Sequence, residues 1–264
     1  MRVYSALSIA GAGLALYGIE SISAAVMAAV FFIAGLGISV LMSVRKFEST
    51  WYRARAIAES VKTASWRFMM CAEPFANMAD TAADKKAFTY LVRTIMLDHK
   101  DLAHDLSGSL AEGEQITSAM INTRSLPLAE RMQIYREHRI DNQRTWYAQK
   151  SNTNKTLGNR WFWVSVGLQA AAVLFVVLRI AEPTFKYWPT EMFVVAATSV
   201  FGWMQTKRFR ELAAAYGLAA HEIGLARSQL DDISTEQAFS EYVGDTENAF
   251  SREHTQWAAR KDAG

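Results

Sequence analysis

The sequence predicts an all-α integral membrane protein with two transmembrane helical hairpins, hence four spans, and a cytoplasmic helical bundle. Most apolar residues lie in two blocks, 3–44 and 161–204, whereas a soluble globular protein spreads them at a period of 2 or 3.6 residues. The remainder of the chain is charged. The 264 residues include 4 prolines and 14 glycines, so long loops are few, which suits an all-helical chain.

The first hairpin is expected over residues 1–44. Glu20 is the only charged residue in this apolar block. A bilayer core of about 30 Å needs about 20 residues of helix, so the block is roughly twice one span and should fold back near Glu20–Ser23. Gly11 and Ala15 have the small-xxx-small spacing that lets helices approach closely in lipid. A signal peptide cut near Ser23 is disfavoured, because the apolar stretch is long and its basic start is Arg2 alone.

The second hairpin is expected over residues 161–206. Its first span runs from Trp161 to Leu178 and is broken before Pro183, because proline cannot continue a helix without penalty. The return span is expected at about Tyr187 to Met204. Aromatic rings prefer the membrane interfaces, and five lie near the expected ones: Trp161, Trp163, Tyr187, Trp188 and Trp203.

Basic residues indicate the orientation of the hairpins. They follow the first hairpin, precede the second and follow it again: Arg45, Lys46, Arg53, Arg55, Lys150, Lys155, Arg160, Lys207, Arg208 and Arg210. The positive-inside rule therefore places both termini, residues 45–160 and the C-terminal helices at 207–264 in the cytoplasm. The single cysteine, Cys71, suits that reducing side and excludes an internal disulfide or a cysteine-based zinc site.

Helical periodicity continues through the cytoplasmic parts. Ile57, Val61, Ala64 and Phe68 form an apolar stripe. The expected segments are a helix over 45–71, a break at Glu73–Pro74, a helix over 82–106, a helix after Pro127 that continues to Lys150 or directly into the third span, and C-terminal helices broken near Asp231–Asp232. A hairpin followed by a basic helix occurs twice, so a duplicated unit remains an open alternative.

Three clusters combine polar and aromatic residues. Trp51, Arg55, Glu59, Lys62 and Trp66 share one side of the first cytoplasmic helix, beside the apolar stripe. The second cluster comprises Tyr135, Arg139, Gln143, Trp146, Lys150 and Asn154, and the third comprises Glu247, Ser251, Glu253, His254 and Trp257. One interpretation is that they tie helices together, with aromatic rings over cationic side chains. The other is a surface that contacts a signal or another subunit.

These clusters carry a resemblance. Three motifs resemble those of the bacterial SLATT superfamily, including a DUF4231-type domain: Trp51-Tyr52-x-x-Arg55-Ala56-x-Ala58-Glu59-Ser60-x-Lys62-x-x-x-Trp66, Arg139-x-x-x-Gln143-x-x-Trp146-Tyr147-x-x-Lys150, and Ser251-x-Glu253-His254-x-x-Trp257. The resemblance implies a homo-oligomeric effector of bacterial defence in the inner membrane. It further implies that a nucleotide second messenger or a cytosolic sensor protein triggers a pore through the lipid bilayer. The alternative is a non-conducting scaffold or receptor subunit that recruits a cytosolic partner.

Enzymatic chemistry and nucleic-acid binding are not expected. His99 and His104 are five residues apart, which is not the i,i+4 spacing of two metal ligands on one helix face. The sequence shows no phosphate-cradling glycine loop, nucleophile elbow or zinc motif, so no cofactor is expected. A net charge of +2 is too small to argue for nucleic acid.

Four polar residues are candidates for a pore lining. Gln169 lies in the middle of the third span, and Ser165, Thr198 and Ser199 lie at similar depth. Polar side chains inside a membrane tend to face protein or water, which favours a lining role. Ordinary helix–helix contacts are the alternative, since hydroxyl and amide groups also hydrogen-bond between helices in lipid.

Overall fold

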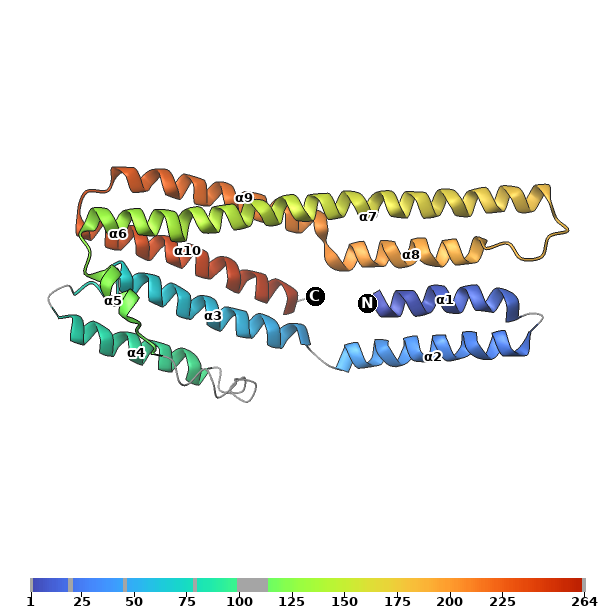
Figure 1. Ribbon diagram of the computed structural model, residues 1–264, viewed down its shortest axis with the longest axis horizontal. Helices are drawn as coiled ribbons and strands as arrows, with labels where there is room; N and C mark the ends of the chain where they lie inside the picture. Colours follow the sequence, from blue (N-terminus) through green and yellow to red (C-terminus); the bar gives the residue numbers. More distant parts are fainter. Residues whose placement is uncertain (1, 19–20, 45–46, 78–79, 99–113, 263–264) are drawn as a thin grey trace. The chain divides into compact units, whose positions relative to one another are not determined.

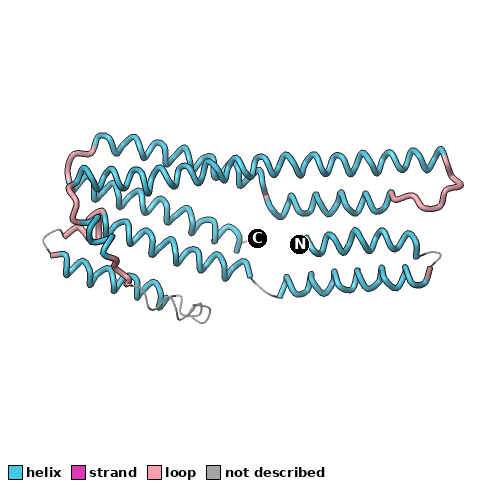
Figure 2. Tube along the Cα trace, in the orientation of Figure 1, coloured by secondary structure: helices cyan, strands magenta, loops and turns pink. Residues whose placement is uncertain are grey.

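The computed structural model describes the chain except for residues 1, 19–20, 45–46, 78–79, 99–113 and 263–264. Near some helix ends, including 47–53 and 252–262, only the backbone is described. Every regular element within these described residues is a helix, which confirms the all-α class (Figure 2).

The described chain forms two compact units. The first, here the apolar unit, comprises Met1–Lys46 and Tyr147–Ala219. The second, here the charged unit, comprises Phe47–Trp146 and Ala220–Gly264. The apolar unit takes one segment from each half of the chain, and the segment Phe47–Trp146 of the charged unit extends from the first half into the second. The apolar unit extends beyond the apolar blocks of the sequence, because it also includes residues 147–160 and 207–219.

In the apolar unit, α1 (Arg2–Gly18) packs against α2 (Ile22–Val44), as Figure 1 shows. The α1 helix ends at Gly18 and α2 begins at Ile22, close to the reversal expected near Glu20–Ser23. The α1 helix also packs against α8 (Thr190–Lys207). That helix begins three residues later than expected, because proline lacks the N–H of a helix interior and Pro189 takes the position before the first helical residue.

Two long apolar segments of this unit are largely uncovered. By length and composition, two of the described helices qualify as membrane spans: Ile22–Leu41 within α2, and the continuous helix Leu128–Ala181, which contains α7 (Asn142–Ala181). Only 11% of the apolar stretch is buried in each case, whereas the core helix of a soluble protein is mostly buried. A shorter apolar segment, Ala6–Leu16, lies in α1.

The charged unit is built around α3 (Phe47–Met69), which packs against α4 (Thr81–Asp98), α5 (Ser118–Arg124) and α10 (Glu236–Asp262). Its apolar core contains Ala64, Phe68, Phe75, Phe88 and Val92. The three phenylalanine rings have centroids 5.3 to 5.8 Å apart. Ala64 and Phe68 belong to the predicted apolar stripe, so the buried face of this helix is confirmed at those two positions.

The remaining elements match most of the predicted breaks. A turn follows α3 at Glu73–Pro74, and α6 (Leu128–Tyr135) begins after Pro127. A π-helical segment, η3 (Arg136–Asp141), joins α6 to α7, so the helix after Pro127 runs directly into the apolar stretch. A short 3-10 turn, η4 (Leu230–Asp232), separates α9 (Phe209–Gln229) from α10. Of the helix expected over 82–106, the part beyond Asp98, with His99 and His104, lies outside the described residues.

Candidate functional site

The Glu247 carboxylate is the centre of a buried polar network in the charged unit. Its side chain is 0% exposed. Arg139 donates two hydrogen bonds to it, from Nε at 2.7 Å and from Nη2 at 2.6 Å. The Tyr135 hydroxyl donates a third at 3.0 Å, and the Thr63 hydroxyl donates a fourth at 2.9 Å. This set, called the Glu247 hub below, joins α3, α6, η3 and α10.

The π-helical segment explains how one helix supplies the buried side of this hub. Arg131, Tyr135, Arg139 and Gln143 are all buried and follow one another at a strict spacing of four residues. In a regular α-helix each step of four residues turns about 40° around the axis, so three steps would carry Gln143 about 120° away from Arg131. A π turn holds more residues than an α turn and rotates the face back.

Charge and burial act together on the groups of the hub. Burial alone would lower the pKa of Arg139, but hydrogen bonds and the charge of Glu247 raise it above its ordinary value. Burial, with the adjacent Glu247 charge, holds the pKa of Tyr135 well above its usual range. Lys62 lies near the hub, and its pKa is lowered by burial and by the positive charge of Arg139. The hub is thus a fixed ion pair with a neutral tyrosine, bordered by a half-exposed lysine.

The structure brings members of the first two predicted clusters together around this hub. The Arg55 guanidinium lies 5.4 Å from the centre of the Trp146 ring. The Trp66 ring meets the Tyr135 ring edge-on at 5.7 Å. The half-buried Glu59 pairs with Lys62 on α3 at 3.9 Å, and Gln143 is buried one turn after Arg139. Lys150 is exposed and belongs to the apolar unit.

Some predicted contact residues cannot be placed at the side-chain level. Trp51 lies in α3, and Glu253, His254 and Trp257 lie in α10, but their side chains are outside the described part of the chain. Their role therefore stays a prediction from sequence.

The four candidates for a pore lining lie in the apolar unit. The Gln169 amide donates to the Ser165 hydroxyl at 3.0 Å, one turn away on α7. The Thr198 hydroxyl donates to the backbone carbonyl of Val194 at 2.9 Å, and Ser199 is half-buried on α8. These hydrogen bonds stay within single helices, so they leave the lining role a prediction.

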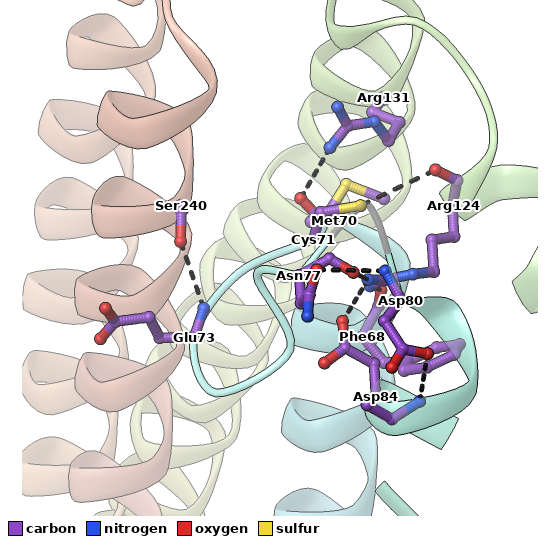
Figure 3. A network of polar contacts seen from close by, with 11 residues as sticks. Phe68, Met70, Cys71, Glu73, Asn77, Asp80, Asp84, Arg124, Arg131 and Ser240 are labelled. Atoms are coloured by element: carbon purple, nitrogen blue, oxygen red, sulfur yellow. Dashed lines mark hydrogen bonds and ion pairs between the residues drawn. The ribbon is translucent and has the colours of Figure 1, made fainter. Parts of the chain in front are cut away.

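Two arginines, which the sequence analysis did not single out, donate hydrogen bonds to backbone carbonyls at the end of α3 (Figure 3). Arg124 donates to the Phe68 carbonyl at 2.6 Å and pairs with the buried Asp84. Arg131 donates to the Met70 carbonyl at 2.8 Å and pairs with Glu236 of α10. The last carbonyls of a helix lack partners within it, and these guanidinium groups donate to the carbonyl of Phe68 in the last turn of α3 and to that of Met70 just after it.

A sequence signal for these ion pairs exists in the apolar stripes. Asp84 precedes Phe88 and Val92 at four-residue steps, and all three are buried on one face of α4. Glu247 likewise follows Val243 on the buried face of α10. A charged residue in register with an apolar stripe is rarely buried without a partner, so each one predicts a buried cation.

Metal binding finds no support in the described part of the chain, where no group of three or more His, Cys, Asp or Glu side chains is arranged to hold an ion. The polar network around Glu247 consists of direct hydrogen bonds between protein groups. Its chemistry is that of a structural ion-pair network, which can hold helices together and respond to a change of charge.

Two family models match the chain in succession. Residues 1–132 match SMODS and SLOG-associating 2TM effector domain 3, and residues 135–257 match SMODS and SLOG-associating 2TM effector domain 1. The chain belongs to the SLATT superfamily. The SLATT resemblance of the sequence motifs is thereby confirmed. No curated protein and no solved structure matches the chain.

Membership in SLATT fixes the broad character of the protein. The matched domains are two-transmembrane effector domains associated with SMODS and SLOG, so this SLATT protein is a membrane-associated effector. Two SLATT models in tandem are also the arrangement that a duplication would produce. The Glu247 hub joins the two matched regions, since Thr63 belongs to the first and Tyr135, Arg139 and Glu247 to the second.

Proposed function

We propose that this SLATT protein is a membrane effector of a bacterial defence system that assembles into homo-oligomers and permeabilises the inner membrane on a cytoplasmic, nucleotide-linked signal. It would act on the bilayer rather than as an enzyme. One observation carries the proposal: two tandem 2TM effector domains make up the chain, and its long apolar helices are left uncovered. The association of these domains with SMODS and SLOG supports a nucleotide-linked trigger.

Four spans follow from this proposal, two for each SLATT domain. The α2 helix and the apolar part of α7 are long enough to cross a bilayer. The α1 and α8 helices have 17 and 18 residues, at the lower end of the range of about 17–25 residues that crosses the hydrocarbon core. With basic residues flanking both hairpins on one side, the charged unit and both termini would lie in the cytoplasm.

Lys62 is the residue that we assign to contact with the signal. Its side chain is 46% exposed, while partial burial and the charge of Arg139 lower its pKa. An anionic messenger at this position would raise the pKa of Lys62 again, because a nearby negative charge stabilises the charged ammonium. Replacement Lys62→Gln should then raise the messenger concentration needed for activation, whereas the exposed Lys85→Gln on α4 should not.

Permeabilisation is tested in two settings. In bacterial cells, induced expression together with a cyclic-nucleotide-producing enzyme should depolarise the membrane and admit an impermeant dye. In vesicles that carry the purified protein, addition of cyclic dinucleotides and related oligonucleotides should release a trapped dye. Inserted protein that neither depolarises cells nor releases dye in either setting would contradict permeabilisation and favour the non-conducting scaffold.

The lining role of Gln169 has its own test. Replacement Gln169→Leu removes the amide but keeps a similar volume, so conductance or ion selectivity should change if the amide faces the water path. The matched control Thr206→Val removes a hydroxyl near the end of α8. This hydroxyl donates a hydrogen bond to the Gly202 carbonyl of the same helix. Unchanged conductance in Gln169→Leu would reject the lining role and leave permeabilisation itself intact.

A further inference from the structure

Cationic and aromatic side chains gather where the apolar stretches of the apolar unit end. The group is called the basic collar below and consists of Arg160 and Phe162 on α7, Trp203 and Lys207 on α8, Arg208 at the end of α8, and Arg210 on α9. Its four cationic side chains are exposed.

One contact within α8 and two contacts between α7 and α9 arrange the side chains of the collar. The Lys207 ammonium lies 5.0 Å from the centre of the Trp203 ring, and the Arg210 guanidinium lies 6.0 Å from that of Phe162. A Cβ at Gly158 would lie 3.2 Å from the Cβ of Phe209, so α7 and α9 approach closely at this level. Arg208 adopts a left-handed conformation at φ 48°, which turns the chain from α8 into α9 and keeps the cations in one neighbourhood.

The collar carries an excess of positive charge. The whole of α7, residues 142–181, contains no aspartate or glutamate. Glu211 is the one acidic side chain within three residues of Arg208, and it pairs with Arg208 at 3.6 Å. Arg160, Lys207 and Arg210 are then left as three positive charges beside the apolar stretch.

Exposed aromatic rings mark the level of the collar. Phe162 is 40% exposed and Trp163 is 68% exposed, shortly after Arg160 in the chain. Aromatic rings of this kind sit at the headgroup level of a bilayer, with apolar helix on one side and charge on the other.

We propose that the basic collar binds the phosphate groups of anionic lipid headgroups. Charge complementarity carries the choice of ligand: three cations stand without an equal number of carboxylates at the polar end of an apolar surface. Clusters of basic residues at the end of a membrane helix are attracted to anionic lipids, each by about 1 kcal/mol. The rings of Trp203 and Phe162 hold two of the cations in place before lipid binds.

The test compares anionic with zwitterionic lipid on the full-length protein. Purified protein in detergent micelles is titrated with phosphatidylglycerol or phosphatidylcholine, and bound lipid is counted by native mass spectrometry. Phosphatidylglycerol should bind more tightly. Lys207→Gln combined with Arg210→Gln should weaken it about thirtyfold, because each charge contributes about a fivefold factor. The control Lys85→Gln with Lys86→Gln removes two exposed charges from α4 and should bind as the native protein does.

Further arms separate the sources of phosphate and guard against misfolding. Inorganic phosphate should not compete at millimolar concentration if the ligand is a lipid headgroup. Arg160→Gln alone should weaken binding about fivefold, and the exchange Lys207→Arg with Arg210→Lys should retain it. Equal binding of the two lipids, equal loss in the α4 control, or full competition by inorganic phosphate would each overturn the proposal. This assay measures lipid binding and not dye leakage, so its result does not depend on whether the protein permeabilises membranes.

Discussion

A carboxylate withdrawn from water must have its charge and its lone pairs met by other groups. Glu247 meets this condition through the guanidinium of Arg139 and the hydroxyls of Tyr135 and Thr63. Two parallel bonds to an arginine fix the geometry as well as the charge. The hydrogen bonds of the Glu247 hub therefore link α3, η3 and α10 at one point.

Removing the charge of Glu247 should destabilise the charged unit strongly. Breaking a buried ion pair typically costs about 3–5 kcal/mol, because the partner charge is left buried. Glu247→Gln should lower the free energy of unfolding by a large part of that amount, measured by urea denaturation in micelles with far-UV circular dichroism. The control Glu241→Gln removes an exposed carboxylate from the same helix and should change little. Equal effects of the two variants would contradict the hub.

Arg124 depends on the shape of its side chain as well as on its charge. Its guanidinium bonds the Phe68 and Asn77 carbonyls and pairs with Asp84, which a lysine ammonium cannot reproduce in one geometry. Arg124→Lys should cost about 1–3 kcal/mol in the same denaturation assay. The exposed Arg93→Lys on α4 is the matched control. A tolerated Arg124→Lys would show that charge alone suffices.

The sequence predicted some of these residues and missed others for a physical reason. Arg139 and Trp66 stood out because they belong to polar-aromatic clusters with helical spacing. Arg124 and Arg131 did not, since they bond carbonyls of α3 that are far away in sequence. Contacts of a side chain with a distant backbone leave no spacing pattern, although the position of Asp84 in an apolar stripe is a signal from which a buried cation could have been predicted.

At the scale of elements, the breaks were predictable because they depend on local chemistry. Pro183 and Pro189 flank the loop between α7 and α8, and Pro127 precedes α6. The π-helical segment was not predicted. Its signal is the run of four buried positions from Arg131 to Gln143 at steps of four, which a regular α-helix cannot keep on one face.

The α1–α2 hairpin depends on a close approach at Gly11. A Cβ there would lie 2.9 Å from the Phe32 ring, so a larger side chain must displace it. Gly11→Leu should lower the thermal midpoint in micelles, at a cost of about 1–3 kcal/mol. The matched change Gly37→Leu, on α2, meets no atom within 4 Å and should be neutral or stabilising. Destabilisation by Gly37→Leu to the same degree would contradict this packing.

At the scale of the molecule, the two compact units cut across the two SLATT domains. The apolar unit contains one segment from residues 1–132 and one from residues 135–257, and the segment Phe47–Trp146 of the charged unit extends from the first matched region into the second. The order of apolar and charged segments was predictable from composition, because lipid and water select for it. The pairing of segments from different halves was not, since it depends on contacts such as that of Arg131 with Glu236.

Labelling of single introduced cysteines in a Cys71→Ala background tests the proposed topology. Cysteines at Ser21 and Glu182, near the two hairpin tips, should react with an impermeant thiol reagent added outside intact inner-membrane spheroplasts. A cysteine at the exposed Lys85 should react only after the membrane is opened. In the native protein, Cys71 is buried and burial raises its pKa. Its thiol should therefore react slowly whether or not the membrane is opened. Labelling of Lys85→Cys from outside would reverse the orientation.

Glu247 belongs to the second matched region and accepts a hydrogen bond from Thr63 of the first, which has a genetic consequence. If the gene were split after codon 133, the second fragment would retain Glu247 with Arg139, but would lose the Thr63 hydroxyl and the α3 surface that shields the pair. The first fragment would keep Arg131 without the carboxylate of Glu236. Neither fragment would be self-sufficient, and the two should rescue each other only when they are made in the same cell.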